Sequence, residues 1–132
     1  MKTLTIKQPY ASLIAEGYKE YEFRSWKTSF RGEIYIHAGK TVDKEAMEYF
    51  KDYHLNCPLG CIIAKAKVID CVKTDDEFCK KQLEKDPKVY HNLLKKKEKR
   101  YGFHLADVKK IKPIPAKGKL SFWEYQETEE RI

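Results

Sequence analysis

Residues 17–26 read Gly-Tyr-Lys-Glu-Tyr-Glu-Phe-Arg-Ser-Trp, and they are expected to lead the chain from a helix into a strand. Successive side chains of a strand alternate between its two faces, so Glu22, Arg24 and Trp26 are predicted on one face and the residues between them on the other. A carboxylate, a guanidinium and an indole in a row suit a flat, polar, anionic ligand such as a nucleotide. An exposed edge strand with ordinary surface charges has the same residue types, so this stretch alone leaves both interpretations open.

Short helices and strands are predicted on both sides of this stretch. In the first half, helices are expected at 10–17 and 41–53, and strands at 4–7, up to residue 26, and at 32–38. In the second half, helices are expected to begin at residues 74 and 86, and strands to lie at 61–72, 101–105 and 108–114, before a last short element at 119–125. The elements interleave without regular βαβ repeats. This pattern favours an α+β fold, with a small mixed β-barrel and flanking short helices, over a doubly wound sheet.

The composition is that of one folded domain spanning residues 1–132. The chain is 42% hydrophobic and 13% aromatic with only 6 Gly and 5 Pro, which argues against disorder. No apolar run approaches the length of a membrane span, and the sequence starts directly in a strand-like segment instead of a signal peptide. A cytoplasmic monomer with a frayed tail at 127–132 is expected.

Positive charge is concentrated in the second half of the chain. The net charge is +7, and residues 95–119 contain ten Lys or Arg residues against two acidic ones. Such asymmetry favours a polyanionic partner, nucleic acid before membrane, although an ordinary lysine-rich surface has the same composition. The residues predicted to guide nucleic acid toward the protein are Lys95, Lys96, Lys97, Lys99, Arg100, Lys109 and Lys110.

The cysteines and histidines do not form a metal-binding motif. Cys57 and Cys61 are separated by three residues in the manner of half a metal site, but Cys71 and Cys79 lack a short ligand spacing. The four histidines are scattered without a pairing motif. Reduced, mostly buried thiols are therefore expected, with no metal and no cofactor.

Several blocks of sequence resemble one known family. Residues 4–14 read Leu-Thr-Ile-Lys-Gln-Pro-Tyr-Ala-Ser-Leu-Ile, residues 17–24 fit the spacing Gly-x-Lys-x-x-Glu-x-Arg, and residues 32–38 follow as Gly-Glu-Ile-Tyr-Ile-His-Ala. In this combination the chain resembles the ASCH domain (activating-signal-cointegrator homology), and residues 107–123 resemble the closing strands of that family. The resemblance implies a PUA-like fold, a cleft beside the signature, and binding of RNA or another single-stranded nucleic acid. A modified nucleoside is a further ligand that it suggests.

The resemblance also implies a set of site residues. By position, Lys19, Glu22 and Arg24 would line the cleft, with Lys7 and Gln8 entering from the first strand and helix. The residue pattern adds Trp26, His37 and Trp123 as ligand-binding candidates. A nucleic-acid-binding module is the leading interpretation.

Two other interpretations of the same residues stay open. One branch of the family resembles amidohydrolases that deacylate a modified cytidine with the signature lysine and a threonine, and Glu22 occupies the threonine position here. A carboxylate cannot act as that hydroxyl nucleophile, but Lys19 and Glu22 could form a catalytic acid/base pair, and ribonuclease activity is an alternative use of the cleft. The third interpretation is a buried cluster that only braces the barrel.

Overall fold

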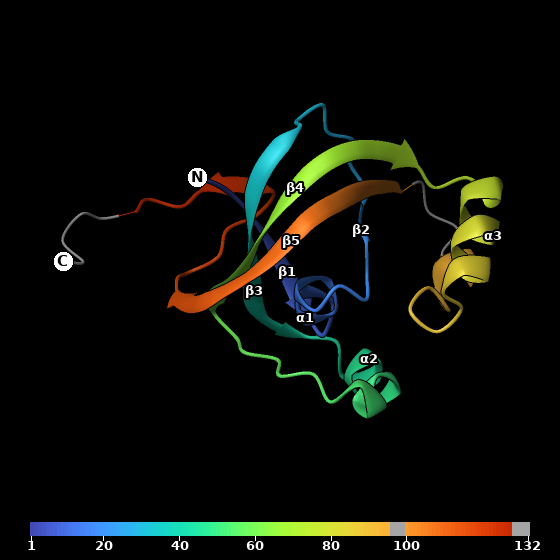
Figure 1. Ribbon diagram of the computed structural model, residues 1–132, viewed down its shortest axis with the longest axis horizontal. Helices are drawn as coiled ribbons and strands as arrows, with labels where there is room; N and C mark the ends of the chain where they lie inside the picture. Colours follow the sequence, from blue (N-terminus) through green and yellow to red (C-terminus); the bar gives the residue numbers. More distant parts are fainter. Residues whose placement is uncertain (96–99, 128–132) are drawn as a thin grey trace.

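The computed structural model describes residues 1–95 and 100–127 and shows a single curved sheet with short helices around it (Figure 1). The strands are β1 (Lys2–Gln8), β2 (Tyr21–Arg24), β3 (Gly32–Val42), β4 (Cys61–Lys73), β5 (Tyr101–Pro115) and β6 (Phe122–Glu124). The helices are α1 (Tyr10–Ala15), α2 (Lys44–Tyr49) and α3 (Asp76–Lys85), with 3-10 turns η1 (Lys51–Tyr53) and η2 (Leu93–Lys95). None of these helices is long and apolar enough to cross a membrane.

The six strands lie in the order β2-β5-β4-β3-β1-β6. The β1–β3 pair is parallel and the other pairs are antiparallel. This arrangement confirms the predicted mixed α+β class. The sheet does not close on itself, however, so the word barrel describes its curvature and not a continuous ladder of strands.

The main core lies between α1 and the inner face of the sheet. α1 buries Ala11 and Ile14 in this core and Leu13 in a second hydrophobic cluster. On β3, Ile34 and Ile36 are fully buried in this core. The helix ends before Gly17, whose φ of +84° is one that glycine adopts without steric strain, and the chain then turns directly into β2.

Several predicted elements differ from the structure. The helix expected at 41–53 is the short helix α2 followed by η1, because β3 continues to Val42. Residues 87–92 form turns before η2, and the helix expected from Asp86 does not form. The Asp86 carboxylate accepts the backbone N–H of Val89 at 3.0 Å, and burial of Val89 and Leu93 fixes this compact turn. The two strands expected at 101–105 and 108–114 are one strand, because Asp107 at φ +51° absorbs an irregularity without ending β5.

The end of the described chain is tied to the sheet. The hydroxyl group of Tyr35 donates a hydrogen bond to Glu127, which was expected to lie in a frayed tail. Residues 128–132 of that tail lie outside the described residues.

Candidate functional site

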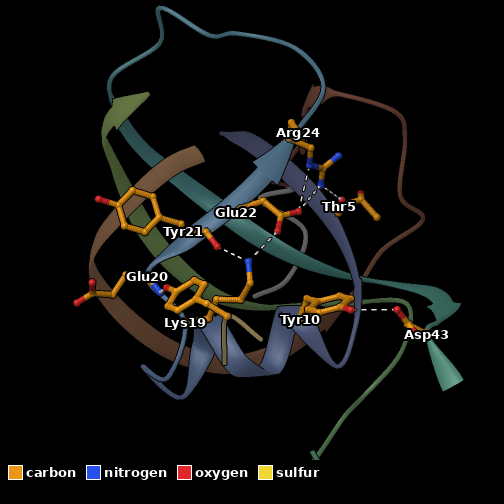
Figure 2. Close-up of polar contacts among 9 residues, drawn as sticks. Thr5, Tyr10, Lys19, Glu20, Tyr21, Glu22, Arg24 and Asp43 are labelled. Carbon is orange, nitrogen blue, oxygen red and sulfur yellow. Dashed lines mark hydrogen bonds and ion pairs between the residues drawn. The ribbon is translucent and has the colours of Figure 1, made fainter. Parts of the chain in front are cut away.

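The signature residues form one charged cluster at the junction of α1 and β2. The Lys19 ammonium lies 3.5 Å from Oε1 of Glu22, and Nη2 of Arg24 lies 3.0 Å from Oε2. Figure 2 shows the two cations on either side of the Glu22 carboxylate. The predicted alternation therefore holds for Glu22 and Arg24. The side chain of Glu22 is only 10% exposed, so both ion pairs are shielded from bulk water.

Arg24 also joins two strands that do not pair. Its Nε donates to Oε2 of Glu22 at 3.1 Å, and its Nη2 donates to the backbone carbonyl of Thr5 in β1 at 2.6 Å. β6 pairs with β1 only over residues 2–4, so the carbonyl group of Thr5 lies beyond the end of that pairing. The guanidinium therefore supplies a link between β1 and β2 where the sheet supplies none.

Lys19 lies behind Glu22 in an almost water-free environment. Its side chain is 5% exposed, its Nζ donates to the carbonyl of Tyr21, and it lies 4.6 Å from the centre of the Phe23 ring. Burial lowers the pKa of Lys19 to about 8, and the nearby Glu22 carboxylate opposes that shift. The positive charge of Arg100 also lowers the pKa of Lys19, so this guanidinium contributes to the electrostatic environment of the cluster.

The lowered pKa of Lys19 predicts a pH-dependent stability. From about pH 8 up to 10.5, the unfolded chain retains a proton on this lysine that the folded chain has released, so stability rises with pH. Below pH 8 both states are protonated and Lys19 adds no pH dependence. Between pH 7 and pH 9 the free energy of unfolding is expected to rise by about 1 kcal/mol more in the wild type than in Lys19→Met. Urea unfolding of both proteins at the two pH values measures this difference. Parallel pH profiles of the two proteins would show that Lys19 does not titrate in this range.

A cavity of about 700 Å³ opens beside this cluster. Its lining comes from β1, β2, the end of β3 and the loop between β5 and β6. The charged residues of the lining are Lys7, Glu22, Arg24, Lys40, Lys117 and Lys119. Because Glu22 is already paired with two cations, the field in the cavity is positive and suits an anionic ligand.

A chain of hydrogen bonds fixes the β5–β6 loop that forms one wall of the cavity. Nε2 of His37 donates to the carbonyl of Ala116 at 2.7 Å, and Nδ1 of the same ring shares a hydrogen bond with the Thr5 hydroxyl at 3.1 Å. The Thr5 oxygen accepts in turn from Nε1 of Trp123 at 2.9 Å. Every member has its partner, so β1, β3 and β6 together hold the loop in place.

The close approach of this loop depends on Gly118. A Cβ atom at that position would lie 2.8 Å from Cε1 of His37 and 2.8 Å from Oγ1 of Thr5. Glycine is therefore the residue that lets the loop backbone rest directly on the hydrogen-bonded pair. The lysines on either side of it belong to the cavity lining.

Comparison with known proteins identifies this arrangement. The sequence profile of the ASCH domain matches residues 4–115. The chain belongs to the ASCH domain family. This result confirms the resemblance inferred from the sequence blocks around the signature.

Two curated relatives are the proteins called activating signal cointegrator 1 from Homo sapiens and from Mus musculus. They are 35% and 36% identical to this ASCH domain over 81 aligned residues, which cover 52% of this chain. The match spans 14% of the length of each relative. The crystal structure of ASCH from Zymomonas mobilis has a TM-score of 0.56 and 20% identity, covering 86% of this chain and 72% of that one, which shows the shared fold.

Four of the predicted ligand-binding residues line the cavity of this ASCH domain, namely Lys7, Glu22, Arg24 and His37. Two others reach it only through a neighbour: Lys19 lies behind Glu22, and Trp123 bonds to Thr5 in the cavity wall. The predicted residues therefore divide into four that line the cavity and two that contact its lining from behind.

Gln8 and Trp26 do not line the cavity. The amide of Gln8 is buried and donates to Oγ of Ser12 and to the carbonyl of Pro58, both at 2.9 Å, so it braces α1. Trp26 packs edge-on against Phe103 and Phe122 in the main core. Trp26 was predicted to share a strand face with Glu22 and Arg24, but β2 ends at Arg24, so the alternation of side chains does not extend to Trp26.

The predicted basic stretch does not form one surface. Lys109 pairs with Lys65 across β4 and β5, whereas the next residue, Lys110, forms a 2.6 Å ion pair with Glu16 at the end of α1. Consecutive strand residues face opposite sides of the sheet, so these two lysines cannot act together. Lys96, Lys97 and Lys99 lie outside the described residues, and only the backbone of Lys95 is described.

Several cavity residues had no distinctive sequence signal. Thr5 and Lys40 lie in ordinary strand and turn patterns, and Lys117 and Lys119 were only part of a long charged segment. The sequence Lys-Gly-Lys at 117–119 lies next to a strand end. Its glycine is the signal that could have indicated a close approach of this backbone to another segment, with a lysine on either side. Within the described part of the chain, no group of metal-binding side chains comes together.

Proposed function

We propose that this ASCH domain binds single-stranded nucleic acid, RNA foremost, in the cavity beside the Gly-x-Lys-x-x-Glu-x-Arg signature. The observation that carries the proposal is the charge of the lining, in which one paired carboxylate is surrounded by five cations. Lys7, Lys40, Lys117 and Lys119 give phosphate groups several partners at the exposed rim. Phosphate neutralisation by such side chains supplies most of the affinity for a single strand.

The size and rigidity of the cavity support recognition of an unstacked nucleotide. A volume of about 700 Å³ lies in the range of small-ligand sites, so a nucleotide unit can enter while the rest of the strand follows the rim. The walls are fixed by the Arg24–Thr5 link and by the His37 hydrogen bonds. Single-stranded recognition of this kind relies on bases turned out of a stack into a shaped pocket.

The test is the salt dependence of binding to a labelled, unstructured RNA oligonucleotide, measured by fluorescence anisotropy. Each phosphate contact on a single strand contributes about −0.7 to the log–log slope, so the double variant Lys117→Gln/Lys119→Gln should bind more weakly and with a slope shallower by about 1.4 if both contacts are made. The matched control is Lys51→Gln/Lys81→Gln, which removes the same charge from lysines paired with Glu48 and Glu77 outside the cavity. Equal losses in the two double variants would assign the binding to net charge and contradict the cavity as its site.

A hydrolase is the second candidate function, because the lowered pKa of Lys19 is a feature of many catalytic lysines. The geometry gives it less support, since Lys19 is enclosed by Tyr21, Glu22 and Phe23 and does not line the cavity. Release of acetate from N4-acetylcytidine by the wild type, lost in Lys19→Met, would favour this function. Cleavage of the labelled RNA during the binding assay would favour the ribonuclease alternative in the same way.

A further inference from the structure

Strand β1 presents an open backbone edge to the cavity at Lys7. The carbonyl of Gln8 accepts the N–H of Asp43, just past β3, at 2.9 Å, so the even-numbered residues of β1 direct their backbone groups toward β3. On the opposite side, the carbonyl of Met1 accepts a backbone N–H from the chain just past β6 at 3.0 Å, so the odd-numbered residues face β6. The pairing with β6 covers residues 2–4, so the N–H and C=O of Lys7 lie at an edge that β6 does not reach.

The neighbouring strand β2 leaves this edge open as well. Among the described strands β2 is at the end of the sheet and pairs with β5, so the gap between β1 and β2 is crossed by a side chain and not by a ladder of backbone bonds. That side chain is Arg24, whose Nη2 donates at 2.6 Å to the carbonyl of Thr5, the preceding outward residue of β1. Lys7 lies one outward position further along and belongs to the cavity lining, so its backbone groups face the space that a ligand would occupy.

The outward edge of an extended residue offers one donor and one acceptor side by side. A matching ligand presents an acceptor next to a donor, as the Watson–Crick edge of every nucleobase does: N3–H and O4 in uracil, N4–H and N3 in cytosine, N6–H and N1 in adenine, and N1–H and O6 in guanine. Leu120 lines the cavity with its side chain 93% exposed, which gives the ring an apolar surface. The lysines of the lining suit the phosphate group attached to such a base.

A peptide strand has the same alternation of donors and acceptors, but it fits this edge less well. Addition of a strand to a sheet edge uses several consecutive outward positions. The preceding one on β1 is Thr5, whose carbonyl bonds to Arg24, and the following one is Pro9, which has no N–H. Within the described chain the open edge is therefore one residue long, which suits a planar base and not an extended peptide.

We propose that the backbone N–H and C=O of Lys7 bind the Watson–Crick edge of an unstacked nucleobase in the cavity. This inference rests on the proposed single-strand binding and adds the groups that hold the base. Because all four bases present a donor beside an acceptor on this edge, the recognition tolerates every base but requires that the edge be free. The base can belong to an RNA strand or to a free nucleotide, because the two share this chemistry.

The experiment compares an oligouridine with two methylated strands of the same length and charge. In one strand every base is 3-methyluracil, whose methyl group replaces the N3–H donor, and in the other every base is 5-methyluracil, whose methyl group leaves this edge free. With anisotropy measured at one ionic strength, the 5-methyl strand is expected to bind like oligouridine and the 3-methyl strand about tenfold more weakly, which corresponds to one good bidentate contact. Equal affinities would overturn the role of Lys7 and leave the proposed function intact, whereas no binding of any of the three strands would overturn both.

Two substitutions of Lys7 separate its backbone from its side chain. Lys7→Ala removes the ammonium group and retains the N–H, so all three strands should bind more weakly with their ratio preserved. Lys7→Pro also removes the N–H, which an edge position tolerates, so the preference for the 5-methyl strand should disappear; an unchanged preference would overturn the assignment. If Lys7→Pro does not fold, as judged by thermal melting, the methylated strands on the wild type decide the matter alone. Competition by the 5′-monophosphate of 5-methyluridine and not by that of 3-methyluridine supports the same recognition and assigns it to free nucleotides as well.

Discussion

Replacing Glu22 with alanine is expected to lower the free energy of unfolding by about 3–5 kcal/mol, as removal of one partner from a buried ion pair does. Lys19 would lose its anionic partner while remaining 5% exposed among aromatic rings, and Arg24 would lose the contact that aligns it with Thr5. The affected groups lie in β1, in β2 and in the segment between α1 and β2, so the variant loosens the junction beside the cavity. Urea unfolding at neutral pH, followed by far-ultraviolet circular dichroism, measures the difference.

Glu20→Ala is the matched control, two residues away. Glu20 also forms an ion pair, with Lys85 at 2.9 Å, but both side chains are largely exposed, at 43% and 61%. Exposed pairs contribute little, so the expected change is below about 1 kcal/mol. The double variant Lys19→Met/Glu22→Ala should recover part of the loss, because it removes the unpaired buried charge. Similar losses in Glu20→Ala and Glu22→Ala would show that burial does not strengthen the Glu22 cluster.

The parts of the site that could be predicted from sequence are those fixed by local geometry. Glu22 and Arg24 share a face because they are two residues apart in a strand, and Gly17 ends the helix that precedes them. Their shared strand face follows from spacing alone. The position of Lys19 does not, because its burial depends on Tyr10 and Phe23 and on a carbonyl group of the following strand.

The parts that could not be predicted depend on contacts between distant segments. Trp26 joins the main core because Phe103 and Phe122 arrive there from β5 and β6, and no local pattern indicates that meeting. The turns at 87–92 replace a helix because Val89 and Leu93 pack against side chains such as Tyr21 and Cys79. Tertiary packing overrides local propensity at both places.

The wall of the cavity shows the same limit most clearly. Thr5, His37 and Trp123 are far apart in the sequence, and they meet because β1 pairs in parallel with β3 and antiparallel with β6. In the parallel β1–β3 pair, Thr5 lies opposite His37. In the antiparallel β1–β6 pair, Trp123 lies opposite Thr3, two residues from Thr5. His37 was predicted as a ligand-binding residue, and its hydrogen bonds assign it a second task, which is to hold the loop that presents Lys117 and Lys119.

That task leads to a prediction for Gly118→Ala, a single added methyl group that should weaken the proposed nucleic-acid binding at least tenfold. The new Cβ would lie within 3.0 Å of atoms of both His37 and Thr5, and His37 is 1% exposed, so the ring cannot move aside. The loop must shift outward, which breaks the 2.7 Å bond from His37 to Ala116 and displaces the flanking lysines from the cavity. Overpacking of this kind destabilises a protein by about 1–3 kcal/mol, so the melting temperature should fall as well.

Gly17→Ala is the control that separates this effect from a general loss of stability. Gly17 has a φ of +84°, and apart from its chain neighbours no atom of residues 1–95 and 100–127 lies within 4 Å of the position that an added methyl group would take, so alanine there strains the backbone without contacting the loop. Its melting temperature should fall while the affinity of the folded protein for the RNA oligonucleotide stays near that of the wild type. Gly118→Ala should differ from it by losing affinity at temperatures where both variants are fully folded. Wild-type affinity in folded Gly118→Ala would mean that the β5–β6 loop does not position lysines for the proposed phosphate binding.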